Sequence, residues 1–88
     1  MNKEFSIIYN PISGNGKSNY IVKRLQIDFN KRNIQYKLYQ SEYSGHIKYL
    51  CTTINSENFI IIGGDGTFNE AINGFMNKGY KENLNITF

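Results

Sequence analysis

Two glycine-rich segments of this sequence contain residues that could bind phosphate. The first, at residues 13–16, follows the apolar residues 5–9, and the second, at residues 63–67, follows the β-branched run 60–62. Each segment leads into an amphipathic pattern, so each predicts a strand, a tight turn and a helix start. Such a turn directs backbone N–H groups and a helix N-terminus at one point, as phosphate binding requires. The two turns together predict one nucleotide-phosphate site.

The second turn offers the most specific chemistry. Gly63, Gly64 and Gly66 allow a close approach that a Cβ atom would block. Asp65 would be repelled by phosphates unless a cation balances it, so it is the candidate for organising Mg²⁺ and supporting the reacting end of a nucleotide. The alternative is that Asp65 caps the following helix, and Thr67 could either cap that helix or bind phosphate.

Other polar residues near the turns have simpler interpretations. Asn10 could hydrogen-bond either the turn backbone or a nucleotide. Lys17 could reach a phosphate, although a solvated lysine is the more common case. Glu70 is interpreted as a surface or supporting group, and His46 as a surface or capping histidine, because no partner carboxylate lies within sequence reach of it.

Neither turn matches the two best-known phosphate motifs. A Walker A loop ending in Gly16-Lys17 would require glycine at position 11, which is Pro11. The dinucleotide fingerprint G-x-G-x-x-G requires glycine at positions 19 and 69, and both are asparagine. A P-loop nucleotidase and a classical dinucleotide-binding domain are therefore disfavoured.

Strand and helix patterns alternate along the whole chain. This order predicts an α/β fold, a parallel β-sheet with helices on both faces (three αβα layers) and ligands at the carboxyl ends of the strands. With a strand order of 2-1-3-4, the second and fourth strands would be the two edges of the sheet. Strands are predicted at residues 5–10, 34–40, 58–62 and 84–88, and helices at 17–32, 46–55 and 68–78.

Apolar spacing predicts which side of each helix is buried. The predicted inner residues are Ile21, Val22, Leu25 and Phe29 in the first helix, Ile47, Leu50, Cys51 and Ile54 in the second, and Ala71, Ile72, Phe75 and Met76 in the third.

Composition narrows the class of protein. The 88 residues allow one domain, and the net charge of +3 is spread over scattered Lys and Arg, which suits solvated helix faces better than a nucleic-acid patch. The single cysteine excludes an internal disulfide. No apolar run is long enough to cross a bilayer, and no signal-peptide core is present. We expect a cytoplasmic protein whose contact with membrane, if any, is peripheral.

The pattern Asn10-Pro11-x-Ser13-Gly14-x-Gly16, combined with residues 63–67, resembles the diacylglycerol kinase catalytic-domain family of bacterial diacylglycerol kinases and related lipid kinases. The resemblance runs from Phe5 to the end of the chain. It includes Asn69-Glu70, Asn73-Gly74 and residues 41–46.

The resemblance implies an ATP-binding N-terminal α/β domain and a C-terminal β-sandwich that carries the metal ligands and the catalytic base. Residues 1–88 are then expected to be the ATP-binding part alone, with ATP and Mg²⁺ as cofactors, no metal ligands of its own and no turnover by itself. Position 41 is usually threonine in the family, and Ser41 keeps the hydroxyl. The ATP-binding residues implied are Asn10, Pro11, Ile12, Ser13, Gly14, Ser41, Gly63, Gly64, Asp65, Gly66, Thr67, Phe68 and Asn69, with Asp65 in a supporting catalytic role.

Two alternatives stay open at the level of sequence. NAD kinases and phosphofructokinases also use a Gly-Gly-Asp-Gly turn, although the Asn10 to Gly16 pattern argues against them. A non-catalytic nucleotide-binding module is the other. The expected partners are the nucleotide, a lipid at the membrane surface for the intact protein, and a second copy of the chain, since the outer strands leave open edges.

Overall fold

The computed structural model describes residues 4–79 and 85–87. The elements are β1 (Glu4–Tyr9), the short 3-10 turn η1 (Ser13–Gly16), α1 (Lys17–Lys31), β2 (Gln35–Gln40), α2 (His46–Thr53), β3 (Asn58–Ile62), α3 (Asp65–Lys78) and β4 (Asn85–Thr87).

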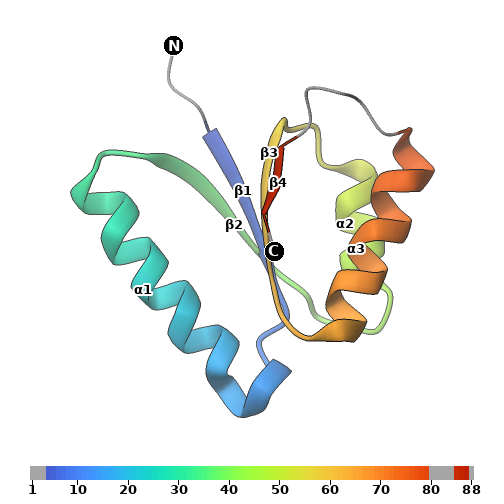
Figure 1. The fold of residues 1–88 in the computed structure, drawn as a ribbon, viewed down its shortest axis with the longest axis horizontal. Coiled ribbons are helices and arrows are strands. Elements are labelled where there is room, and N and C mark those ends of the chain that lie inside the picture. The colour runs from blue at the N-terminus through green and yellow to red at the C-terminus, as the bar shows by residue number, and fades with distance from the viewer. Residues whose placement is uncertain (1–3, 80–84, 88) are drawn as a thin grey trace.

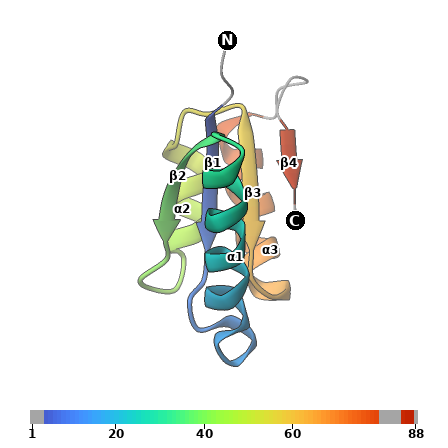
Figure 2. The same ribbon diagram turned by 90° about the vertical axis from the view of Figure 1, so that its left-hand side faces the viewer.

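The strands form one parallel sheet in the order β2-β1-β3-β4, which confirms the predicted fold class and matches the order 2-1-3-4 considered from the sequence. Helix α1 covers one face, and α2 and α3 lie together on the other (Figure 1). A view onto the sheet shows α1 in front of the strands (Figure 2). Because all strands run in the same direction, their carboxyl ends lie at one edge, where the connecting loops can form a common site.

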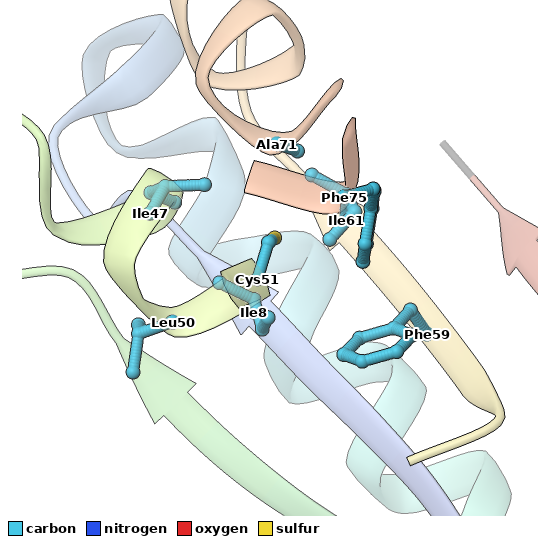
Figure 3. Close-up of a cluster of buried hydrophobic side chains, with 8 residues drawn as sticks. All are labelled: Ile8, Ile47, Leu50, Cys51, Phe59, Ile61, Ala71 and Phe75. Atoms are coloured by element: carbon cyan, nitrogen blue, oxygen red, sulfur yellow. The ribbon is translucent and has the colours of Figure 1, made fainter. Parts of the chain in front are cut away.

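Alternating side chains of β1 and β3 supply two separate cores, since successive residues of a strand point to opposite faces. The core under α2 and α3 is drawn in Figure 3 and consists of Ile8, Ile47, Leu50, Cys51, Phe59, Ile61, Ala71 and Phe75. The core under α1 consists of Ile7, Tyr9, Val22, Phe29 and Ile62. Each helix layer is therefore held to the sheet by its own apolar cluster.

Helices α2 and α3 approach each other closely at Gly74. A Cβ at this position would lie 2.5 Å from the Lys48 carbonyl oxygen and 2.7 Å from Cys51 Cβ. The Thr52 hydroxyl lies 2.8 Å from the Lys48 carbonyl oxygen and 3.3 Å from that of Gly74. This contact fixes the helix that follows the second glycine turn against its neighbour.

The prediction of burial is wrong for three of the inner residues. Ile21, Ile72 and Met76 are 44%, 45% and 68% exposed. In α3 the buried side is centred on Gly74, Ala71 and Phe75, because α3 packs on α2 as well as on β3 and the close approach needs a residue without a side chain.

Three helix boundaries also differ from prediction, and that of α1, which ends at Lys31 rather than at residue 32, differs by one residue. Helix α3 begins at Asp65 rather than near residue 68, so the second turn is shorter than expected. Helix α2 ends at Thr53, although Ile54 still packs on the core. Of the predicted last strand, residues 85–87 are strand, and residues 84 and 88 lie outside the described residues. Within the described ranges, the structure contains no helix with the length and apolar character needed to span a membrane.

Candidate functional site

Backbone hydrogen bonds bring three loops together at the carboxyl edge of the sheet. The Asn10 N–H donates to the Ile62 carbonyl oxygen at 3.2 Å, which places the residue after β1 beside the end of β3. The Ser41 N–H donates to the Tyr9 carbonyl oxygen at 2.9 Å, which places the residue after β2 beside the end of β1. The segments that the sequence singled out are therefore neighbours in space.

The first turn is organised by Asn10. Its side-chain oxygen accepts the Ile12 N–H at 3.2 Å, and its carbonyl oxygen accepts the Ser13 N–H at 3.2 Å. Of the two roles open to Asn10 in the sequence, the structure shows the bond to the turn backbone. The Pro11 carbonyl oxygen accepts the Asn19 amide at 3.2 Å, which ties the turn to α1.

The chain enters α1 through three consecutive residues with positive φ. These are Gly14 at 62°, Asn15 at 56° and Gly16 at 90°. L-residues other than asparagine and aspartate rarely adopt this region, so glycine at positions 14 and 16 meets a backbone requirement. Lys17 then begins the helix.

The glycines of the second turn are of two kinds. At Gly63 a Cβ would lie 2.4 Å from Thr67 Oγ1 and 2.6 Å from Thr67 Cβ, and Thr67 itself is buried, so the fold excludes a side chain there. A Cβ at Gly64 or at Gly66 would meet nothing within 4 Å. The turn therefore leaves open space at these two positions, which is what the close approach of a ligand needs.

The N-terminus of α3 faces this open space. The residue before the helix is Gly64, and no side chain caps the helix, so the capping roles suggested for Asp65 and Thr67 are wrong. The Phe68 N–H donates to the Gly64 carbonyl oxygen at 3.1 Å. The N–H groups of Asp65, Gly66 and Thr67 precede it in the first turn, where N–H groups have no partner within a helix. Together with the helix dipole, such N–H groups can bind an anion.

The described residues form hollows along this edge. One of about 410 Å³ lies between the turns and has an apolar floor that includes Ile21, Leu25 and Ile60. A second of about 560 Å³ lies beside the loop after β2, and a third of about 430 Å³ lies at the start of α3.

Twelve of the thirteen predicted ATP-binding residues line these hollows. Ser13, Gly14, Gly63, Gly64 and Phe68 line the first, Asn10, Pro11, Ile12 and Ser41 the second, and Asp65, Gly66, Phe68 and Asn69 the third. Thr67 lines none of them, because its side chain is buried against Gly63.

Residues outside the predicted set also contribute. Lys17 lines the first hollow. Glu70 lines the second, and its Oε1 accepts the Lys48 N–H at 3.4 Å, so it links α3 to the first turn of α2. This is the supporting position that the sequence suggested for Glu70. Among the residues that the structure describes, no group of three or more His, Cys, Asp or Glu is arranged to hold a metal ion.

One family model and several curated proteins match this sequence. The family model described as "Diacylglycerol kinase catalytic domain" matches residues 4–88. The "Putative lipid kinase YtlR" of Bacillus subtilis is 32% identical over 73 residues, which cover 76% of this chain and 24% of that protein. The "Diacylglycerol kinase" of Staphylococcus saprophyticus is 32% identical over 89 aligned positions, which cover 98% of this chain and 29% of the relative.

A solved structure agrees with this assignment. "A putative diacylglycerol kinase from Bacillus anthracis str. Sterne" matches with a TM-score of 0.65 and 26% identity, over 82% of this chain and 27% of that chain. The chain thus spans about a quarter of the length of these relatives. With the family model matching nearly the whole sequence, this chain belongs to the diacylglycerol kinase catalytic domain family.

Proposed function

We propose that residues 1–88 bind ATP with Mg²⁺ at the carboxyl edge of the sheet and form the nucleotide-binding part of a lipid kinase. The observation that carries this proposal is the open space at Gly64 and Gly66 in front of the N-terminus of α3. Packing within the turn requires glycine only at position 63, where Thr67 excludes a side chain. The two further glycines have no such structural reason, and a bound phosphate supplies one.

In this proposal the phosphates of ATP lie against the first-turn N–H groups of α3. Phosphoryl transfer depends mainly on positioning and on neutralising charge, and these N–H groups provide both. Exposed Asp65 lies at the same point and supports the Mg²⁺ that accompanies the nucleotide. The rest of the nucleotide occupies the hollow beside Asn10 and Ser41. The base that deprotonates the acceptor is not among the residues assigned to this edge.

The acceptor we propose is the hydroxyl group of diacylglycerol or of a related lipid. The support is the family itself and the printed names of the relatives, which are a lipid kinase and diacylglycerol kinases. A lipid acceptor also implies peripheral contact with a membrane surface for the intact protein. A small acceptor such as NAD or a sugar phosphate remains the competing class, because those kinases use a similar glycine turn.

Calorimetric titration with ATP and Mg²⁺ tests nucleotide binding. We expect weak binding by the wild-type chain and at least a tenfold loss in Gly64→Val, because the added side chain would occupy the open space. Asn73→Val, on the exposed side of α3, is the control and should bind like wild type. No binding by wild type, or equal binding by Gly64→Val, would contradict the site assignment.

A radiolabelled ATP assay tests which acceptor is phosphorylated and whether these 88 residues alone catalyse the transfer. We expect the 88-residue chain alone to transfer no phosphate to diacylglycerol in detergent micelles above background. Efficient formation of phosphatidic acid would show that the catalytic base lies within these residues. Phosphorylation of NAD or fructose 6-phosphate instead would favour the competing class of kinase.

A further inference from the structure

The loop after β2 forms one wall of the second hollow. Its first residue, Ser41, is buried and is tied to β1 through the Tyr9 carbonyl oxygen. The following residues 42–44 are exposed and line the same hollow. An exposed loop of this kind needs local contacts to keep one conformation, and the described structure shows where they come from.

His46, the first residue of α2, makes three contacts with this loop. Its Nδ1 accepts the Glu42 N–H at 2.9 Å. Its ring stacks on the Tyr43 ring, with centroids 4.3 Å apart and planes at 10°. The backbone N–H of His46 donates to the Tyr43 carbonyl oxygen at 3.1 Å. The sequence suggested only a surface or capping histidine, and the structure instead directs this side chain back onto the loop.

The hydrogen bond to Glu42 makes a specific chemical demand. An Nδ1 that accepts carries no proton, so this bond assigns the ring proton to Nε2. The accepting atom is also the ring nitrogen nearer to the backbone. Asparagine places an oxygen at a similar distance from its Cβ, whereas glutamine places its oxygen one bond farther out.

We propose that His46 is a positioning residue for the nucleotide. By accepting the Glu42 N–H it holds residues 42–44 as the wall of the hollow that contains Asn10 and Ser41. It touches no reacting group itself. The nucleotide part of this proposal rests on the proposed function, whereas the holding of the loop does not.

Three variants separate the hydrogen bond from the ring. His46→Asn keeps an acceptor near the Nδ1 position and removes the ring, His46→Phe keeps the ring and removes the acceptor, and His46→Gln misplaces the acceptor. We expect His46→Asn to bind ATP and Mg²⁺ within twofold of wild type. We expect His46→Phe and His46→Gln to bind about fivefold more weakly, as for the loss of one hydrogen bond of ordinary strength.

Amide hydrogen exchange at Glu42 provides a readout that does not depend on the nucleotide. We expect this amide to be protected in wild type and in His46→Asn. In the other two variants it should exchange about fivefold faster, because the closed loop loses one hydrogen bond of ordinary strength. Unchanged exchange in His46→Phe and His46→Gln would overturn the holding role. Faster exchange with unchanged affinity would overturn the positioning role. A wild-type chain that shows the expected exchange pattern and binds no ATP would overturn the proposed function and keep the holding of the loop.

Discussion

Neighbouring glycines in the second turn should respond in opposite ways to the same substitution. Gly63→Ala places a Cβ between 2.4 and 2.6 Å from the side-chain atoms of Thr67, whose own Cβ is one of them. Carbon atoms in contact normally lie ~3.5–4.0 Å apart. Rotation of the Thr67 side chain cannot relieve a clash with its Cβ, so the turn or the start of α3 must move.

The size of this effect follows from comparable cases. Forcing an extra carbon into a packed site typically costs ~1–3 kcal/mol. A small domain has a total stability of ~5–15 kcal/mol, so this is a substantial part of it. For a domain of this size each kcal/mol lowers Tm by ~4–8 °C, so we expect Gly63→Ala to melt at least ~4 °C below wild type.

Gly64→Ala is the matched control one residue along the chain. Its backbone is extended, with φ −95° and ψ −166°, and its new Cβ would meet nothing within 4 Å. Alanine at such a position restricts the unfolded chain, which adds ~0.4–1 kcal/mol of stability. Gly64 is also the N-cap of α3, where alanine is less favourable than glycine, and this offsets part of the gain. We expect an unchanged or slightly higher Tm with weaker ATP binding.

Thermal and urea unfolding followed by circular dichroism measure both variants under identical conditions. A Gly63→Ala protein as stable as wild type, or a Gly64→Ala protein that loses more stability than Gly63→Ala, would refute the interpretation that packing requires glycine at position 63 and not at position 64.

Gly74→Ala should destabilise the protein by ~1–3 kcal/mol in urea unfolding, because its Cβ would overlap the Lys48 carbonyl. Asn73→Ala, on the exposed side of α3, should be near neutral, and similar losses in both variants would contradict the close helix contact. Burial raises the pKa of the Cys51 thiol from 9.0 to about 12, partly opposed by nearby Lys78 and slightly aided by Glu70. The stability linked to this thiol is therefore complete below pH 9 and falls as the pH rises through about 12. The folded protein should resist iodoacetamide at pH 8, and rapid alkylation without unfolding would contradict this burial. Sedimentation across the micromolar range should show self-association, because the outer strands leave open edges; a clean monomer that melts cooperatively would contradict it.

The sequence predicts the architecture well because its signals are local. The apolar runs that become β1 and β3, the glycine turns after them and the alternation of strand and helix each leave a short-range pattern. The parallel sheet with helices on both faces then follows from general rules of chain connection.

Features that depend on packing between distant elements are harder to predict. Periodicity alone places Ile72 and Met76 inside, yet the buried side of α3 is set by its contact with α2 at Gly74. The burial of Thr67 against Gly63 likewise appears only once the turn is folded. His46 gives no sequence signal of its contact with Glu42, because the bond depends on the path of an exposed loop.

Amide chemical-shift mapping of the isotope-labelled chain with ATP and Mg²⁺ would locate the nucleotide residue by residue. We predict shifts concentrated at residues 10–14, 41–44 and 63–69, with smaller changes along the outer faces of the helices. Shifts confined to the helices, or no shifts at millimolar nucleotide, would contradict a nucleotide site at the carboxyl edge of this sheet.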